Sequence, residues 1–226
     1  MNPGALSIVL PVLDEADRIA AALVALAPLR AAGVELLVVD GGSSDATLQA
    51  CAGLADRVFI APRGRARQMN AGAAAASGEV LLFLHADTTL PATALEALRD
   101  ALAGHAGWGR FDVRITGRSP MLPVIAALMN LRSRWTGIAT GDQAMFVRRT
   151  LFEAVGGFPD QPLMEDVELS RRLRRLQAPA CLHQRVDTSG RRWDQHGAWR
   201  TVWLMWSLRL RYWLGVPAEL LARRYR

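Results

Sequence analysis

The sequence contains no lysine, because every one of its 27 basic residues is arginine. A chain without lysine cannot form a lysine Schiff base and cannot carry the Gly-Lys element of an ordinary P-loop. Cysteine is also scarce. Cys51 and Cys181 are the only two, far apart and without C-x-x-C spacing, so neither a thiolate metal site nor a disulfide framework is indicated.

Long hydrophobic runs are missing as well. The first apolar run, residues 5–10, ends at Pro11 and Asp14, which is too short for a signal peptide. The tryptophan-rich stretch near the C-terminus is interrupted by arginines and is shorter than the roughly 20 residues that span a bilayer. Together with the reduced cysteines, these features predict a cytoplasmic protein.

The length and charge of the chain limit the number of domains and the kinds of partner that we expect. Its 226 residues, 51% of them hydrophobic, suffice for one sizeable core, so we expect a single domain over residues 1–226. The net charge of +6 suggests anionic partners. The arginines are scattered along the chain, whereas a reader of duplex nucleic acid would concentrate them on one recognition element, so we expect no nucleic-acid partner.

Short apolar runs alternate with helical patterns through the first half of the chain. The runs lie at residues 6–10, 35–40, 57–61 and 80–85, and the helical patterns at 15–30, 44–54, 66–76 and 91–103. This alternation is typical of parallel strands that helices cover on both faces. We therefore predict an α/β fold with a mixed, mainly parallel, Rossmann-like sheet.

The second half is less regular. It predicts strands at residues 108–115 and 144–148 and helices at 121–131 and 165–176. We interpret residues 1–104 as the nucleotide-binding half, 105–195 as the acceptor-binding half, and 196–226 as a C-terminal amphipathic helix and tail.

Polar residues follow three of the predicted strands. Glu15, Asp40 and Asp87 each come just after an apolar run. Ligands of such sheets bind beyond the carboxyl ends of the strands, so these carboxylates predict a site there. Simpler roles remain open for each position: Glu15 suits the start of a helix, and Asp45, a little further on, is a good helix N-cap.

Several motifs occur in the order found in family-2 glycosyltransferases, and the chain resembles that family, with its GT-A fold, over nearly its whole length. The opening strand and acidic turn read Ile-Val-Leu-Pro-Val-Leu-Asp-Glu, and the second strand and its loop read Val-Val-Asp-Gly-Gly-Ser-Ser-Asp. Four more segments are similar to a short bacterial subfamily associated with arsenosugar biosynthesis and radical-SAM/selenodomain gene neighbourhoods: residues 64–72, 84–88, 141–143 and 189–193.

The resemblance implies a set of residues that hold a nucleotide-sugar donor, in which Glu15 and Asp40 contact the nucleoside, Asp40 through its base. Arg65 and Arg67 open a predicted helix whose N-terminus, with the guanidinium groups, suits a diphosphate. Arg191 and Arg192 also suit a diphosphate, Asp142 lies near the donor sugar or acceptor, and Trp193 stacks on a sugar or acceptor ring. The complete predicted donor set is Pro11, Glu15, Asp40, Arg65, Arg67, Asp87, Asp142, Arg191 and Arg192, with Trp193 on the acceptor side.

His85-Ala-Asp87 stands where the family has its Asp-x-Asp motif. A carboxylate at a strand end can hold Mn²⁺ or Mg²⁺ against the donor's phosphates, so Asp87 is the predicted ligand of a divalent cation. His85 replaces the first acidic residue, and it also fits a simple strand-end histidine. His196 is a further option as a metal ligand, although a lone histidine is more often structural.

The family's acidic catalytic base corresponds to Glu165-Asp166, at the start of an amphipathic helix. We assign Asp166 as the base that deprotonates the acceptor, with Glu165 in support. A single displacement of this kind inverts the anomeric centre. The alternative is that both acids only complement the helix N-terminus.

The last segment sets one apolar stripe on a helix: Trp199, Val202, Trp203, Trp206, Leu210, Trp213 and Leu214. By default this stripe covers the enzyme's own core or a partner subunit, which leaves a homodimer open. The other interpretation is an interfacial helix, with Trp199 to Leu214 in contact with the cytoplasmic face of a membrane.

The function predicted from these features is transfer of a sugar from a nucleotide-diphosphate donor to the hydroxyl of a small or lipid-linked acceptor, with inversion and a divalent cation. A nucleotidyltransferase acting on a sugar phosphate is an alternative, although the first strand lacks the glycine-rich loop that such enzymes carry. A non-catalytic nucleotide or nucleic-acid binding protein is the alternative from another class.

Overall fold

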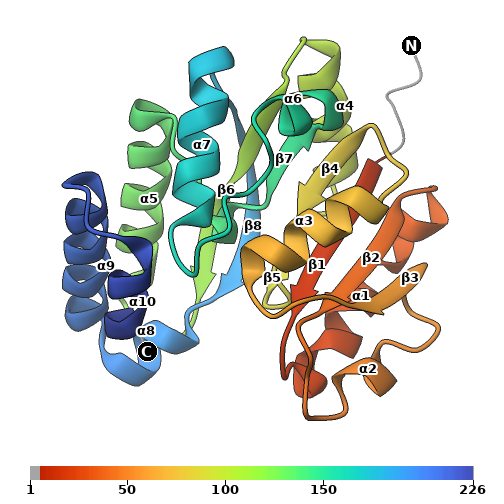
Figure 1. Cartoon of the computed structure of the whole chain (residues 1–226), viewed down its shortest axis with the longest axis horizontal. Coiled ribbons are helices and arrows are strands. Elements are labelled where there is room, and N and C mark those ends of the chain that lie inside the picture. The colour runs from red at the N-terminus through yellow and green to blue at the C-terminus, as the bar shows by residue number, and fades with distance from the viewer. Residues whose placement is uncertain (1–5, 226) are drawn as a thin grey trace.

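The computed structural model describes residues 6–225 (Figure 1). The strands are β1 (Leu6–Val12), β2 (Glu35–Asp40), β3 (Arg57–Ile60), β4 (Val80–Phe83), β5 (Thr88–Thr89), β6 (Trp108–Thr116), β7 (Met145–Arg148) and β8 (Ala180–Ser189). The helices are α1 (Ala16–Ala31), α2 (Thr47–Ala50), α3 (Arg65–Ala75), α4 (Ala94–Ala103), α5 (Leu122–Thr136), α6 (Arg149–Ala154), α7 (Glu165–Leu176), α8 (Arg191–His196), α9 (Ala198–Trp213) and α10 (Ala218–Tyr225), with a 3-10 turn η1 (Gly141–Gln143).

The strands form one sheet in the order β3-β2-β1-β4-β7-β6-β8-β5. β3, β2, β1 and β4 are parallel to one another, β7 is antiparallel to β4 and β6, β8 is parallel to β6, and β5 is antiparallel to β8. The predicted mixed, mainly parallel sheet is therefore confirmed. Strands of both halves of the sequence share this sheet, so their carboxyl-end loops come together.

The period-2 pattern of the strands divides the core into two layers. Ile8 and Leu10 of β1 face the cluster that contains residues of α1, α4 and α5, whereas Val9 faces the cluster with residues of α3, α6 and α7. All three side chains are fully buried. Because both faces are covered, these strands are apolar throughout rather than alternating.

One glycine allows α3 to lie close to the sheet. A Cβ built on Gly72 would be 2.3 Å from Cγ1 of Val9, a distance that no side chain tolerates. This close approach brings the start of α3, with Arg65, to the ends of β1 and β2.

Most predicted elements are present; the short elements β5, α6, α8 and α10 were not predicted, and two further differences concern α2 and β8. Of the helix predicted at residues 44–54, only Thr47–Ala50 is helical. β8 was not predicted, because most of its residues are polar and only partly buried. β8 nevertheless pairs with both β6 and β5 and delivers Ser189 to the end of β4, where its N–H donates to the carbonyl of Asp87.

The C-terminal helices dock on the segment before α7. Leu208 of α9 and Leu221 of α10 are 1% exposed and pack with Leu163 and Met164. In Figure 1, α5, α9 and α10 stand together at one end of the molecule. No helix within residues 6–225 has the length and hydropathy needed to cross a bilayer.

The default interpretation of the apolar stripe on α9 is wrong in one respect, since the stripe does not cover the core of this chain. Trp199, Trp203, Trp206 and Trp213 are 65%, 72%, 68% and 79% exposed. Of the seven stripe residues, Val202 packs against the core. The burial of α9 comes instead from Thr201 and Leu208 on its other side.

Candidate active site

A cleft of about 810 Å³ opens at the carboxyl ends of the strands. Its walls come from the ends of β1 and β4, the start of α3, η1, the start of α7, α8, and the facing sides of α5 and α9. Of the predicted site residues, it brings together Pro11, Glu15, Arg65, Asp87, Asp142, Glu165, Asp166, Arg191, Arg192 and Trp193. Asp40, Arg67 and His196 do not line it.

Hydrogen bonds fix the loop after β1 to the loop after β2. The N–H of Glu15 donates to Oγ1 of Thr47 at 2.8 Å, and the N–H of Ser44 donates to Asp14 at 2.7 Å. The Glu15 carboxylate lies in the cleft wall and pairs with Arg18 at 3.3 Å. Glu15 therefore both begins α1 and presents a carboxylate to the site.

Asp40 lies beneath this wall and is fully buried. Its Oδ1 accepts from the N–H groups of Gly42 and Ser43, both at 2.7 Å, and its Oδ2 accepts from the Ser43 hydroxyl at 2.5 Å. The side chain thus shapes the loop after β2. Its predicted contact with a nucleotide base stays a prediction.

The sequence analysis missed Gln68, a buried residue of α3 that lines the cleft. Its Nε2 donates to the carbonyls of Val12 and Val39, both at 2.8 Å. It therefore joins the ends of β1 and β2 to the start of α3. No motif marks this role, because a single glutamine in an alanine-rich helix carries no local signal.

His85 and Asp142 meet across the cleft floor. Nδ1 of His85 is 3.8 Å from Oδ1 of Asp142, whose side chain is half-exposed. Withdrawal from bulk water acts to raise the pKa of Asp142, but His85 and the positive charges of Arg65 and Arg209 bring the net pKa below its ordinary value. Asp142 therefore remains ionised beside His85.

Asp87 follows β4, and its side chain lines the same cleft. The backbone around it is fixed on both sides, because Thr88 Oγ1 donates to Thr188 Oγ1 of β8 at 3.1 Å and Ser189 N–H donates to the Asp87 carbonyl. This pairing brings α8, directly after β8, close to Asp87.

Within residues 6–225, no group of three or more His, Cys, Asp or Glu side chains could hold a metal ion by itself. A magnesium-type cation needs only one or two protein carboxylates when substrate phosphates and water complete its shell. Asp87, a half-exposed carboxylate in a cleft that also contains Arg65 and Arg191, fits a cation of that kind. His196 is exposed and away from the cleft, so it is not placed to take part.

The start of α7 carries the two predicted catalytic acids. Met164, the residue before it, has a φ of 64°, which is uncommon for a side chain of this size. Such backbone conformations persist where the surroundings hold them, often at functional sites. Here the conformation of Met164 directs Glu165 and Asp166 toward the cleft. The Met164 side chain itself packs with Leu208 of α9 and Leu221 of α10.

The two acids differ in environment. Glu165 is 6% exposed, and burial followed by the charge of Asp166 raises its pKa, against the smaller opposing effect of Arg65. Asp166 is partly exposed, and its Oδ2 accepts from the N–H of Gly141 at 2.8 Å. Glu165 therefore holds its proton more firmly than an ordinary glutamate.

Arg65 faces these acids from α3. Desolvation alone would lower its pKa, but the charges of Glu165, Tyr225, Asp142 and Asp166 together raise it. Arg67 points elsewhere and makes two hydrogen bonds to Asp160, at 2.7 and 3.0 Å, on the exposed surface. Of the two arginines of α3 that were predicted to bind a diphosphate, only Arg65 lies in the cleft.

The Ser-Gly-Arg-Arg-Trp motif forms the end of β8 and the start of α8. Arg191 is exposed in the cleft, whereas Nη2 of Arg192 donates to the carbonyl of Tyr225 at 2.6 Å and its guanidinium lies 3.7 Å from that ring's centroid. Trp193 is partly buried against the core. The N–H of Arg191 donates to Oγ of Ser189 at 3.3 Å, but within residues 6–225 its guanidinium makes no hydrogen bond or ion pair, unlike that of Arg192.

Three further arginines of the cleft, Arg63, Arg132 and Arg209, were not predicted from the sequence. Arg132 of α5 and Arg209 of α9 both line it. The Nε and Nη2 atoms of Arg132 are buried and have no hydrogen-bond partner among the described residues. Desolvation and then the charge of Arg209 lower the pKa of Arg132 to about 9.

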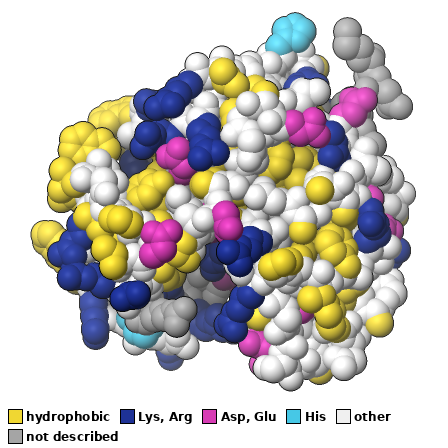
Figure 2. All heavy atoms as spheres, viewed as in Figure 1, with side chains coloured by type: hydrophobic (Ala, Val, Ile, Leu, Met, Phe, Trp, Pro, Cys, Tyr) yellow, Lys and Arg dark blue, Asp and Glu magenta, His cyan; other side chains and the backbone are white. Residues whose placement is uncertain are grey.

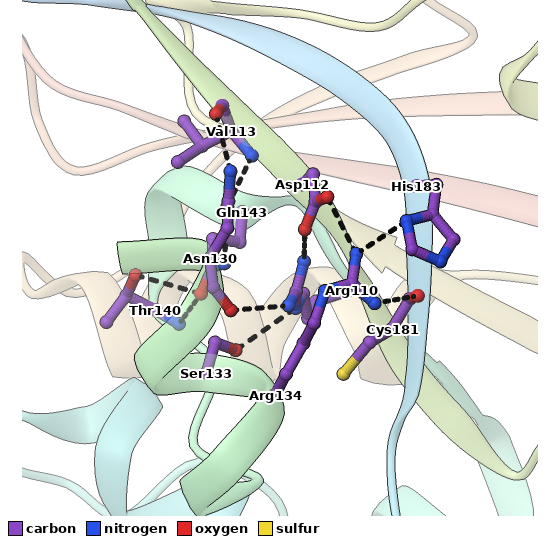
Figure 3. Close-up of polar contacts among 10 residues, drawn as sticks. All are labelled: Arg110, Asp112, Val113, Asn130, Ser133, Arg134, Thr140, Gln143, Cys181 and His183. Atoms are coloured by element: carbon purple, nitrogen blue, oxygen red, sulfur yellow. Dashed lines mark hydrogen bonds and ion pairs between the residues drawn. The ribbon is translucent and has the colours of Figure 1, made fainter. Parts of the chain in front are cut away.

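A polar network beneath α5 supports this side of the cleft (Figure 3). Arg110, which is fully buried, donates to Asp112 and to the hydroxyl of Ser133, and Asp112 also accepts from Arg134 at 2.7 Å. Asn130 exchanges hydrogen bonds with the backbone of β6 at residue 113. The network continues from Asn130 through a side chain of η1, so α5, β6 and the turn that carries Asp142 are held together.

The sheet order, the acidic strand ends and the cleft beyond them define a GT-A type of fold. The model of glycosyltransferase family 2 matches residues 7–155, about two thirds of the chain. The chain therefore belongs to glycosyltransferase family 2. This assignment confirms the resemblance seen in the motifs and removes the ground for the nucleotidyltransferase and the non-catalytic alternatives.

Individual relatives agree with the family. The chain is 28% identical over 204 residues to the probable glycosyltransferase YdaM of Bacillus subtilis, a match that covers 79% of this chain and 47% of the relative. It thus spans about half the length of this curated relative.

Two solved structures share the fold. The Pyrobaculum calidifontis mannosyltransferase PcManGT, determined with GDP-Man and Mn²⁺, superimposes with a TM-score of 0.63 at 20% identity, over 83% of this chain and 57% of that one. The Mycobacterium tuberculosis glucosyl-3-phosphoglycerate synthase, determined with Mn²⁺, UDP and glucosyl-3-phosphoglycerate, gives a TM-score of 0.63 at 24% identity, over 86% and 75% of the two chains.

Proposed function

We propose that this protein transfers a sugar from a nucleotide-diphosphate donor to an acceptor hydroxyl, with inversion at the anomeric carbon and with a divalent cation. The observation that carries the proposal is that one cleft contains Asp87 at the end of β4 and Asp166 at the start of α7. The solved relatives determined with nucleotides and Mn²⁺ support the choice of donor and cation.

The donor side of the cleft suits a nucleoside diphosphate. Pro11 and Glu15 offer a slot for the nucleoside at the end of β1, and Arg65 and Arg191 offer positive charge to the diphosphate. Asp87 would hold Mn²⁺ or Mg²⁺ against the phosphates. When bound, the cation supplies positive charge that stabilises the departing nucleoside diphosphate.

Asp166 is the proposed general base. It accepts the proton of the acceptor hydroxyl while that oxygen forms its bond to the anomeric carbon, and the bond from this carbon to the diphosphate oxygen breaks with its electron pair on the leaving group. Oδ2 of Asp166 accepts from the N–H of Gly141 and Oδ1 from the N–H of Val167 at 2.7 Å, which fixes the carboxylate, and each oxygen keeps a second lone pair for the proton. Glu165, being more readily protonated, limits the negative charge beside the base.

The test is a comparison of Asp166→Asn with the matched variant Asp160→Asn, which changes an exposed aspartate paired with Arg67. Because a general base contributes about 10²- to 10⁴-fold, we expect kcat for donor turnover to fall by that range in Asp166→Asn, with donor affinity retained. Asp160→Asn should turn over like the unmodified protein. Unchanged kcat in Asp166→Asn, or turnover that survives removal of divalent cations with EDTA, contradicts the proposal.

A further inference from the structure

Ten of the fifteen large hydrophobic side chains exposed in the described part of the chain lie on α5 or on α9 and the residue after it. We call these ten residues the tryptophan surface: Val124, Leu128, Leu131, Trp135, Trp199, Trp203, Trp206, Leu210, Trp213 and Leu214. Their spacing sets one stripe on each helix. Figure 2 shows hydrophobic side chains, with basic ones beside them, on the side of the molecule where Figure 1 places α9.

The two helices carry positive charge and no acid. Neither Leu122–Thr136 nor Ala198–Trp213 contains an aspartate or glutamate, whereas they contain Arg132, Arg200, Arg209 and Arg211, besides Arg134, which pairs with Asp112. Two copies of this surface placed face to face would therefore set like charges against each other. An anionic lipid surface offers the opposite charge, and tryptophan is the side chain that favours the boundary between lipid and water.

The tryptophan surface runs directly into the cleft. Leu128, Trp135 and Trp206 are 55%, 81% and 68% exposed and also belong to the cleft wall. Deeper in the cleft, Ile125, Met129, Val202 and Met205 continue the apolar lining between α5 and α9. A hydrocarbon chain could thus pass from the cleft to the outside without crossing a polar rim.

At the inner end of this apolar path stand Arg132 and Arg209. Two nitrogens of Arg132 are buried without a partner in residues 6–225, which is costly for a cation, since a buried charged donor is normally paired. Desolvation lowers the pKa of Arg209 as well, with Asp166 and Asp142 opposing it. An anionic group between the two arginines would satisfy these donors next to Asp166.

We propose that the acceptor is an anionic lipid whose charged head contacts Arg132 and Arg209 in the cleft. Its tail leaves past Leu128, Trp135 and Trp206, and the tryptophan surface rests on the bilayer that holds it. This inference rests on the proposed function for the transfer step, since it names the acceptor of that reaction. The lipid contact itself can be measured without any donor.

The first experiment is flotation of the whole protein with phosphatidylcholine vesicles, with and without phosphatidylglycerol. We expect recovery with the vesicles to require phosphatidylglycerol and to fall as salt is added. The double variant Trp203→Ser/Trp213→Ser, at two exposed positions outside the cleft wall, should bind vesicles at least about tenfold more weakly. The matched control Ile60→Ser/Leu176→Ser, exposed but remote from the tryptophan surface, should bind like the unmodified protein.

The second experiment measures binding of octyl phosphate, below its micelle concentration, against octyl glucoside and inorganic phosphate. Octyl phosphate should bind about tenfold more tightly than either, because it alone offers both the charge and the chain. Arg132→Gln should remove this preference, whereas Arg200→Gln on the exposed side of α9 should keep it. The melting-temperature rise given by nucleoside diphosphate and Mn²⁺ checks that each variant is folded.

Three results would overturn the inference: no recovery with anionic vesicles, octyl glucoside binding as well as octyl phosphate, or a dimer in sedimentation that Trp203→Ser/Trp213→Ser dissociates. The last would assign the tryptophan surface to a second copy of the chain. Failure of the proposed function looks different, because a protein that never turns over a nucleotide-sugar could still float with vesicles and bind octyl phosphate.

Discussion

The backbone N–H of Gly141 donates a hydrogen bond to Oδ2 of Asp166, so the turn after α5 fixes the carboxylate at the start of α7. The same glycine touches His85. A Cβ at position 141 would lie 2.4 Å from Cε1 and 2.7 Å from Nε2 of the imidazole. Gly141 thus fixes the position of Asp166, the proposed base. It also packs closely against His85, the residue that replaces the first acid of the Asp-x-Asp motif.

Gly141→Ala should therefore reduce kcat far more than it reduces donor affinity. The added methyl group must displace His85 or shift the turn, and a misplacement of the base by about 1 Å costs roughly 100-fold in rate. Turnover and donor KM are the quantities to measure. Gly104→Ala is the control, since its Cβ would meet backbone at an ordinary 3.4 Å. Equal turnover in the two variants would show that the turn does not hold the base.

Asp87→Asn should raise the concentration of Mn²⁺ needed for half-maximal donor turnover. An amide is a weaker ligand than a carboxylate for a hard cation, and the described residues offer no preformed cluster to compensate. A manganese titration at saturating donor measures the effect. Asp100→Asn, on the exposed surface of α4, should leave the titration unchanged. An identical curve for Asp87→Asn would place the cation elsewhere.

The raised pKa of Glu165 predicts a pH-dependent stability. Because the folded chain binds this proton more tightly than the unfolded chain, the contribution of Glu165 is complete below about pH 4.5, its ordinary pKa, and is lost as pH rises through the folded pKa. Glu165→Gln keeps the neutral form at every pH. The melting temperature of the variant minus that of the unmodified protein should increase from pH 5 to pH 8. Each kcal/mol of unfolding free energy that the unmodified protein loses over this range corresponds to about 2–4 °C.

A constant difference in melting temperature across this pH range would contradict the assignment. Glu168→Gln is a suitable control, because Glu168 pairs with Arg171 and Arg172 on the partly exposed side of α7.

Asp40→Asn should lower the stability of the protein. The carboxylate accepts three hydrogen bonds from Gly42 and Ser43 in a fully buried position, and an amide group cannot accept all of them. We expect a loss of about 1–3 kcal/mol, measured by denaturant unfolding, against almost none for the exposed Asp17→Asn. Relative affinities for UDP and GDP in the same variant test whether Asp40 also contacts the base.

The parts of the fold that the sequence predicted depend on local pattern. Apolar runs of four to seven residues marked the central strands, and the acidic residues after them marked the rim of the cleft, since parallel strands end on the same side. β8 was missed because its residues are mostly polar and its pairing partner, β6, precedes it by more than sixty residues.

The parts of the site that escaped prediction depend on packing between distant segments. In the sequence, Arg132 and Arg209 have the pattern of ordinary arginines on a helix surface. Only the approach of α9 to α5 places them in one cleft. Conversely, Arg67 matched a motif but pairs with Asp160, which a sequence pattern cannot reveal. Local sequence patterns thus predicted which types of residue form the site, but they did not predict which side chains these residues contact.

The docking of α9 and α10 on Leu163 and Met164 has a consequence for how the molecule assembles. The unusual backbone at Met164, directly before Glu165 and Asp166, is held by contacts with residues as late as Leu221. During synthesis the sheet and its donor-side loops can form from earlier segments, but this cluster cannot close until the final helices have emerged. The backbone turn before the acid pair therefore takes its final shape only after α10 has docked.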